Sequence, residues 1–444
     1  MPFDQQGNRL SGASPAALEY YQRALTAFNL YRGDPFALLE DAIAESPGFA
    51  MAHLLKAYLY ATSTEPAANI AAQKILVATQ VLPLSEQERS HVSVLKSLTG
   101  GNWTEAATAL DYHSCRFPHD LVAIQCGHLM DFYRASSRNL RDRIARVLPQ
   151  WSAEIPGYSL LLGMYAFGLE ECADYERAEA FGHSALELEP FDCWAHHAVA
   201  HVLEMQGRTA EGIRWMQERE PFWAGEDNFF KVHNWWHRAL YHLDQGETEE
   251  ALEIYDGPIR RDASVMALDL VDAAALLWRL VLAGCDVGER WQELADCWEP
   301  HADGHHYPFN DWHGAMAFLG AGRQQALERV GNCLRAGRDS HREVCHWGWE
   351  TGLPLVEGFS AFWEGDYGSA IRHLHSARAI ANTFGGSHAQ RDIIDWTLAE
   401  AALRLGERGT AEAFCEERLA MKPDSNHVRE MVARASGAKP TTAG

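Results

Sequence analysis

Residues 160–192, LLLGMYAFGLEECADYERAEAFGHSALELEPFD, contain the pattern that decides the fold. An apolar stretch leads into the polar turn ECADYE, and a second amphipathic segment follows with small residues at Ala178 and Ala185. Pro190 marks the end of that segment, because proline cannot continue a helix. The pattern predicts two helices joined by a short turn. We expect a second such hairpin to start at Trp194 and to close near Trp215.

The same turn recurs down the chain. It contains a glycine with polar neighbours and a small residue about five positions later. The turn glycines are Gly101, Gly207, Gly246, Gly284, Gly322, Gly365 and Gly406. From Gly207 onward they are 39, 38, 38, 43 and 41 residues apart. Each glycine is expected to end the first helix of its pair in a left-handed conformation, which other residues adopt at a cost.

These repeats predict the fold class. A recurring helix–turn–helix unit is typical of tetratricopeptide repeats, whose period is about 34 residues, and the wider spacing here indicates longer connections. No segment shows the alternation of a strand. We predict an all-α protein, an α-solenoid of tetratricopeptide-like helix pairs wound as a right-handed superhelix. One solenoid is expected over residues 13–435, with degenerate repeats at 13–150 and clearer ones at 151–435. Residues 1–12 and 436–444 are expected to be a flexible start and a disordered tail.

Composition limits the environment and the partners. The formal charge of the 444 residues is −23, so nucleic acid and anionic membranes are poor partners. We find no secretory signal and no apolar run long enough to cross a membrane. The nine cysteines include no C-x-x-C pair, which favours reduced thiols in the cytoplasm. The sequence leaves open whether the chain forms a homo-oligomer.

Five stretches resemble the tetratricopeptide repeat protein 38 family. They are AVAHVLEMQGR (198–208), HNWWHRALYHLDQG (233–246), LDLVDAAALLWRL (268–280), HGAMAFLGAGR (313–323) and GGSHAQRDIIDWTLAEAALRLG (385–406). The resemblance extends from about Met51 to Asp424. It implies a soluble tetratricopeptide-like solenoid. It implies no reaction and no catalytic residues, so candidate sites come from the residues themselves.

Polar side chains recur at equivalent positions of the first helices. Asn234, Asp272 and Asn310 each lie 12 residues before their turn glycine, while His237 and His313 lie 9 before theirs. In such folds the first helices line the concave surface, so these side chains predict a polar and aromatic cleft. The candidate ligand-binding residues are His197, His201, Glu204, His233, Asn234, Trp236, His237, Asp269, Asp272, Asn310, His313 and Arg391.

Histidines spaced four apart also raise the question of a metal. His197, His201 and Glu204 share one helix face, and His233 and His237 share another. Packed helices lie about 8–10 Å apart, so the two faces can meet. A divalent ion at His197, His201 and His237 is a second interpretation, but no cofactor is assigned because H-x-x-x-H alone is a weak signal. The alternative for the cluster is a set of hydrogen-bonded histidines that fixes the repeat register.

Three functions remain open at this stage. The first is a repeat protein that binds a small molecule or a short peptide in the cleft, centred on residues 193–322, with a neutral or cationic guest favoured by the negative charge. The second is an enzyme that uses histidine for acid–base chemistry or a divalent metal for hydrolysis or elimination. Asp269, Asp272 and Arg391 lie among apolar residues, and they either pair across repeats or face such a pocket. The third is a scaffold for a protein partner.

Overall fold

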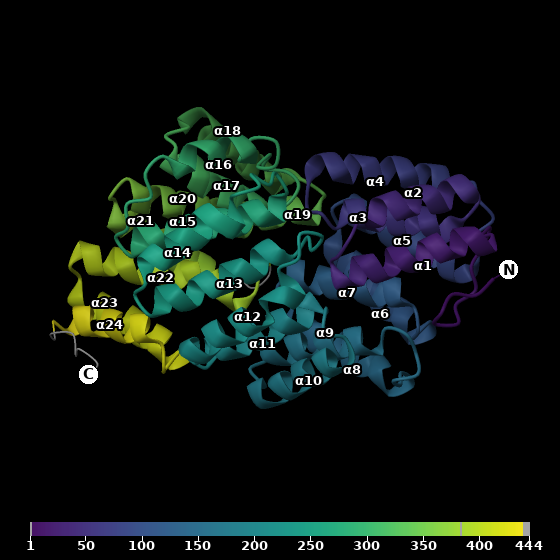
Figure 1. Cartoon of the computed structure of the whole chain (residues 1–444). Helices are drawn as coiled ribbons and strands as arrows, with labels where there is room; N and C mark the ends of the chain where they lie inside the picture. Colours follow the sequence, from purple (N-terminus) through teal and green to yellow (C-terminus); the bar gives the residue numbers. More distant parts are fainter. Residues whose placement is uncertain (1, 382–383, 438–444) are drawn as a thin grey trace. The chain divides into compact units, whose positions relative to one another are not determined.

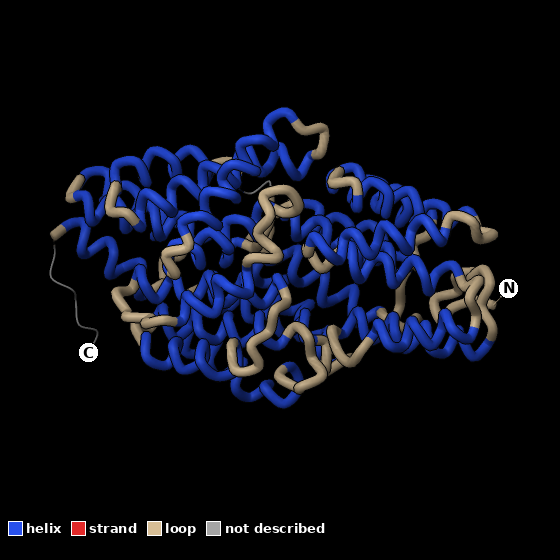
Figure 2. Tube along the Cα trace, turned by 90° about the horizontal axis from the view of Figure 1, so that it is seen from above, coloured by secondary structure: helices blue, strands red, loops and turns tan. Residues whose placement is uncertain are grey.

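The structure is a computed structural model that describes residues 2–381 and 384–437. Across these ranges the ordered elements are helices, and no strand is present (Figure 2). Two isolated β-bridges join Phe3 to Arg9 and Arg32 to Asn228. The all-α class is therefore confirmed. No helix of the described residues is long and apolar enough to cross a membrane.

The chain divides into two compact units. Unit 1 contains residues 1–199, 220–231 and 342–344, and unit 2 contains residues 200–219, 232–341 and 345–444. The boundary falls inside helix α11 (Cys193–Met205), between Val199 and Ala200. One solenoid over residues 13–435 stays a prediction. Within the tail expected at 436–444, residues 438–444 lie outside the described residues.

Unit 1 is built mainly from ten helices that pair in chain order (Figure 1). They are α1 (Pro15–Leu30), α2 (Pro35–Glu45), α3 (Ala50–Ala61), α4 (Pro66–Thr79), α5 (Glu86–Thr99), α6 (Trp103–Arg116), α7 (Leu121–Tyr133), α8 (Ser137–Val147), α9 (Tyr158–Glu170) and α10 (Tyr175–Leu188), with a 3₁₀ turn at Leu148–Gln150. Residues 2–12 precede them, and Ser11 donates its backbone N–H to Glu88 at 2.8 Å. The predicted flexibility of residues 1–12 stays a prediction.

The hairpin α9–α10 has the predicted form. Ala178 and Ala185 are fully buried on α10, where their small side chains let the two helices approach. Ala173 makes the turn with a φ of 60°. The following hairpin begins at Cys193, but its second helix, α12 (Thr209–Trp223), extends beyond the expected end near Trp215. The reason is that the residues after Trp215, MQERE, are good helix formers.

Unit 2 continues the helix pairs but folds back on itself. Its elements are α13 (Lys231–Asp244), α14 (Thr248–Ile254), a π-helical segment (Tyr255–Ile259), α15 (Ala267–Leu282), α16 (Arg290–Trp298), α17 (Pro308–Gly320), α18 (Gln324–Ala336), a 3₁₀ turn (Gly337–Asp339), α19 (Glu343–Trp347), a second π-helical segment (Gly348–Gly352), α20 (Leu353–Trp363), α21 (Tyr367–Arg378), α22 (His388–Leu405), α23 (Arg408–Met421) and α24 (Asn426–Ser436). Beyond the usual contacts between neighbours, α22 packs against α15.

Two hydrogen bonds tie α22 to α15. The indole N–H of Trp278 donates to Thr397 at 3.0 Å, and the guanidinium of Arg279 donates to the backbone oxygen of Ala389 at 2.7 Å. All seven turn glycines have a positive φ, between 65° and 83°. The turn prediction is therefore confirmed, whereas the return of α22 onto α15 breaks the rule that a repeat touches only its neighbours.

Candidate functional site

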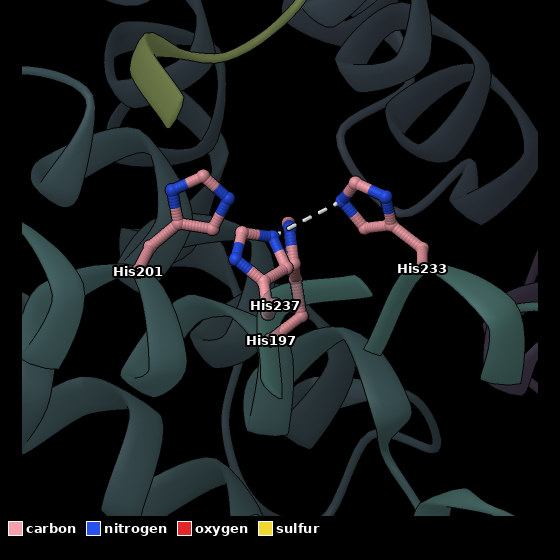
Figure 3. A group of neighbouring side chains, drawn as sticks. All are labelled: His197, His201, His233 and His237. Atoms are coloured by element: carbon pink, nitrogen blue, oxygen red, sulfur yellow. Dashed lines mark hydrogen bonds between the residues drawn. The ribbon is translucent and has the colours of Figure 1, made fainter. Parts of the chain in front are cut away.

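A group of buried histidines lies where α11 and α13 meet. α11 supplies His201 and Glu204, and α13 supplies His233 and His237. His201 and His237 are completely buried, while His233 is 8% exposed. Figure 3 draws these three imidazoles together with His197, which α11 carries one turn before His201 and which belongs to unit 1. Within unit 1, the ring of His197 packs against Phe167, Trp194 and Phe230.

Hydrogen bonds join five side chains of unit 2 into one continuous series. Lys422 donates to Glu204 at 2.8 Å, and the other oxygen of Glu204 lies 3.3 Å from Nδ1 of His237. Nε2 of His237 lies 3.2 Å from Nε2 of His233, the contact drawn as a dashed line in Figure 3. Nδ1 of His233 lies 2.8 Å from a carboxylate oxygen of Asp272. A carboxylate thus holds the Nδ1 atom of each imidazole, and the two Nε2 atoms face each other.

His201 completes the group without belonging to this series. Its ring centroid lies 4.3 Å from that of His237. One ring nitrogen of each of His201, His233 and His237 lies within 4.8 Å of the others. The expectation that side chains of these two first helices meet is therefore fulfilled in the structure, although a ligand for them stays a prediction.

Burial dominates the electrostatics of the group. It lowers the pKa of His237 well below its usual range, and the imidazoles of His201 and His233 lower it further. Burial raises the pKa of Glu204, but Lys422 and His201 lower it by more, so this pKa lies below its ordinary value. The imidazole of His237 is therefore neutral near pH 7 and can act as a base or as a metal ligand.

A second set of charges lies beside the imidazoles. Arg279 is fully buried in α15, and burial lowers its pKa to about 10 against the opposing effect of Asp392 and Glu204. Its guanidinium lies 5.2 Å from the ring of Trp236. Arg418 binds Asp392 through both carboxylate oxygens, at 3.0 and 2.7 Å. These charges come from α15, α22 and α23. Arg418 and Asp392 form an ion pair, whereas Arg279 donates to the backbone oxygens of Ala275 and Ala389.

The space beside these charges is small. A cavity of about 40 Å³ has Glu204, Arg279, Asp392 and Lys422 among its lining residues. A water molecule takes up about 30 Å³ in the liquid, so the cavity has room for water or an ion. A neighbouring pocket of about 100 Å³ is lined in part by Arg391 and His388.

The other predicted residues have different surroundings. Asp269 is held by the hydroxyl of Ser264 at 2.6 Å, and burial raises its pKa to about 6. Nδ1 of His313 donates to the backbone oxygen of Phe309 at 2.8 Å. Arg391 donates to the backbone oxygen of Gly386. Asn234 and Asn310 are buried on α13 and α17, with exposed fractions of 0% and 1%.

The structure therefore separates the predicted residues into two sets. It brings together His201, Glu204, His233, Trp236, His237 and Asp272, the ring of Trp236 being stacked on His233 at 5.4 Å. The described contacts of His313 and Arg391 lie elsewhere. Sequence reasoning missed Lys422 and Arg279. A single arginine within the apolar stretch LLWRLVL could have indicated Arg279, whereas nothing in the sequence near Lys422 pointed to Glu204.

Unit 1 contains a second buried group that the sequence analysis missed, formed by His91, His113 and Asp120. One oxygen of Asp120 lies 2.9 Å from Nε2 of His91 and 3.0 Å from Nε2 of His113. The Nδ1 atoms face the hydroxyls of Tyr58 and Ser90 at 3.0 and 2.9 Å. Each ring therefore donates from Nε2 and accepts at Nδ1, and the group is closed by its own hydrogen bonds.

Comparisons with known proteins give fold-level likenesses. No family model matches the chain. Similar solved structures include the APC/C hetero-tetramer Cut9-Hcn1, with 15% identity over 94% of this chain and 76% of that one and a TM-score of 0.45. A human IFIT1 dimer with m7Gppp-AAAA has 15% identity over 97% and 96% and a TM-score of 0.39. A human IFIT1 dimer with PPP-AAAA has 14% identity over 87% and 90% and a TM-score of 0.40.

These TM-scores lie below 0.5. The fold assignment rests on the chain's own repeats. Helix hairpins follow one another in chain order, and a glycine with a left-handed backbone conformation lies at each of the seven predicted turns. The chain is an all-α repeat protein of tetratricopeptide-like helix hairpins.

Proposed function

We propose that this chain binds a small polar ligand inside unit 2, next to the imidazoles of α11 and α13. The observation that carries the proposal is a cavity of about 40 Å³ whose lining includes Glu204, the residue that also contacts the buried imidazole of His237 at 3.3 Å. A space of this size admits a ligand of a few atoms but not an extended peptide.

The C-terminal helices argue against a peptide in this position. Lys422 follows α23 and binds Glu204 of α11, while Ser425 binds Asp244 at the end of α13. Through these contacts the chain's own residues lie against first helices for which the repeat pattern predicts a cleft. A protein-binding scaffold is therefore the weaker alternative for this face.

Charge narrows the ligand class further. The net charge of −23 favours a neutral or cationic guest. The cavity is lined by the carboxylates of Glu204 and Asp392 as well as by Arg279 and Lys422. Glu204 also contacts His237, and Asp272 contacts His233. We infer that the guest binds at the imidazole side.

Three further inferences belong to this proposal. The family resemblance of the five sequence stretches supports membership of the tetratricopeptide repeat protein 38 family. The nine cysteines, which include no C-x-x-C pair, support a reducing compartment such as the cytoplasm. A homo-oligomer is compatible with the fold, and nucleic acid is a poor partner for so acidic a chain.

A thermal-shift screen tests the proposed function. The full chain is heated with small polar molecules, divalent salts and short synthetic peptides, alongside the variants His237→Gln and His91→Gln. We expect hits among the small ligands, a weaker shift in His237→Gln, and an unchanged shift in His91→Gln, whose histidine belongs to the closed group of unit 1. Hits that come only from peptides, or that shift His237→Gln fully, would contradict the proposal.

A second candidate function is catalysis, and the pair of His233 and Asp272 is the observation that favours it. A carboxylate that holds Nδ1–H orients the opposite nitrogen for proton transfer. Turnover of a ligand found in the screen, reduced in Asp272→Asn while binding is retained, would identify an enzyme.

A further inference from the structure

We propose that His201, His233 and His237 bind one divalent transition-metal ion of the Zn²⁺ type. This inference rests on the proposed function and deepens it, because it names the ligand class of the same imidazoles. The argument comes from the positions of hydrogen-bond donors and acceptors.

The tautomers of two rings are fixed by their neighbours. Nδ1 of His233 lies 2.8 Å from Asp272, and Nδ1 of His237 lies 3.3 Å from Glu204. A carboxylate only accepts hydrogen bonds, so each Nδ1 must carry the proton and donate. In a neutral imidazole the other nitrogen, Nε2, then presents a lone pair.

These two lone pairs point toward one another. Nε2 of His233 and Nε2 of His237 are 3.2 Å apart. An ion between them would accept both lone pairs. Ligand nitrogens of a tetrahedral zinc site lie about 3.3 Å from one another, given Zn–N distances of about 2.0–2.1 Å. The observed separation matches that spacing.

His201 supplies the third nitrogen. It lies within 4.8 Å of the other two, and its ring packs on His237 with centroids 4.3 Å apart. In the proposed site it binds the same ion. Three imidazoles are a frequent protein ligand set for zinc and leave a coordination position for water or a substrate.

The carboxylates complete the arrangement from outside. Ligand histidines commonly donate their second N–H to a carboxylate, which fixes the ring and makes the coordinating nitrogen more basic. Asp272 and Glu204 occupy these positions for His233 and His237. Lys422 holds the other oxygen of Glu204 at 2.8 Å, so that carboxylate stays oriented.

The histidines of unit 1 show what a closed group looks like. There the shared carboxylate of Asp120 faces both Nε2 atoms, and the hydroxyls of Tyr58 and Ser90 face the Nδ1 atoms. Each lone pair has a proton opposite it, so an ion would have to displace existing hydrogen bonds. The contrast assigns the metal to unit 2 and makes His91 a matched control.

The test uses the full chain, stripped with a chelator and titrated with Co²⁺ and Zn²⁺. We expect one Co²⁺ per chain with the visible absorption of a tetrahedral ion, displaced by Zn²⁺. The variant His237→Gln should lose this absorption and bind at least a hundredfold more weakly. Asp272→Asn should weaken binding roughly tenfold to a hundredfold, as loss of an outer-shell carboxylate does. His91→Gln should bind as the wild type does.

Each remaining outcome overturns the inference. Wild-type chain that binds no ion, or binding that His237→Gln leaves unchanged, excludes a metal at these imidazoles. Loss of the absorption in His91→Gln alone would assign the ion to unit 1 instead. The proposed function fails separately: if the thermal-shift screen gives small organic hits that depend on His237 while no metal binds, the pocket stands and the metal does not. Circular dichroism of each variant verifies that it is folded.

Discussion

Replacing Lys422 with methionine should lower the free energy of unfolding by about 3–5 kcal/mol, the usual effect of removing one member of a buried ion pair. Lys422 and Glu204 are 2.8 Å apart, with side chains 12% and 9% exposed. Methionine keeps most of the apolar stem, so the loss comes from a buried carboxylate without its ammonium. Because His237 also contacts Glu204, we expect the lower half of that range.

The assay is urea unfolding of the full chain, followed by circular dichroism at pH 5 and pH 8. In the wild type the pKa of Glu204 is lowered, so its contribution to stability is present above the unfolded pKa and is lost only as the pH falls through the folded one. Without Lys422, burial raises this pKa. The variant should therefore lose stability as the pH rises through the new folded pKa, and its deficit should be larger at pH 8 than at pH 5.

Two variants provide the controls. Glu204→Gln combined with Lys422→Met should be less destabilised than the sum of the single changes, by about 0.5–3 kcal/mol for coupled neighbours. Lys56→Met removes a lysine paired with Glu40, whose side chain is 62% exposed, and should cost less than about 1 kcal/mol. Additive effects at Lys422 and Glu204, or a Lys422→Met variant no less stable than Lys56→Met, would refute the ion-pair argument.

Two other predictions concern single residues. Gly246→Ala should destabilise the chain by about 1 kcal/mol, because Gly246 has a φ of 77° and a Cβ there is strained despite open space. Gly409→Ala in α23 should be neutral or stabilising by about 0.4–1 kcal/mol. Equal melting temperatures for the two variants would contradict this prediction. Burial raises the pKa of Asp192 to about 7. Because its folded pKa is raised, the carboxyl of Asp192 contributes stability to the folded chain below the unfolded pKa of about 3.8, and this contribution is lost as the pH rises through about 7. A pKa difference of about three units corresponds to about 4 kcal/mol. Asp192→Asn keeps an oxygen for the backbone N–H of Ala195, so it should flatten the fall in stability between pH 5 and pH 8, and an unchanged pH profile would show that Asp192 is ionised throughout.

The repeat itself was predictable because its signals are local. A glycine such as Gly284 ends a helix through its own φ of 83°, which depends on no distant residue. The i, i+4 spacing of His233 and His237 likewise fixes a shared helix face. The meeting of that face with Glu204 required one further assumption, that consecutive first helices pack side by side.

The rest of the site depends on contacts between distant parts of the chain. Lys422 and Glu204 are 218 residues apart, and Thr397 and Trp278 are 119 apart. A repeat pattern specifies how each hairpin meets the next. It does not indicate which repeats far apart in the chain contact each other. The closed histidine group of unit 1 was missed for a related reason: Asp120 looks like an ordinary helix cap, and its carboxylate indeed accepts from the backbone N–H of Ala123.

The contact between Lys422 and Glu204 has a consequence for how the polypeptide is made. At about 5–20 residues per second, a ribosome that has just added Glu204 needs roughly 10–40 s to reach Lys422. Throughout that interval α11 and α13 of the nascent chain lack the segment around Lys422 that later contacts Glu204. Premature arrest of translation within α22 or α23 would leave them open to solvent, and such a fragment is a natural client for chaperones.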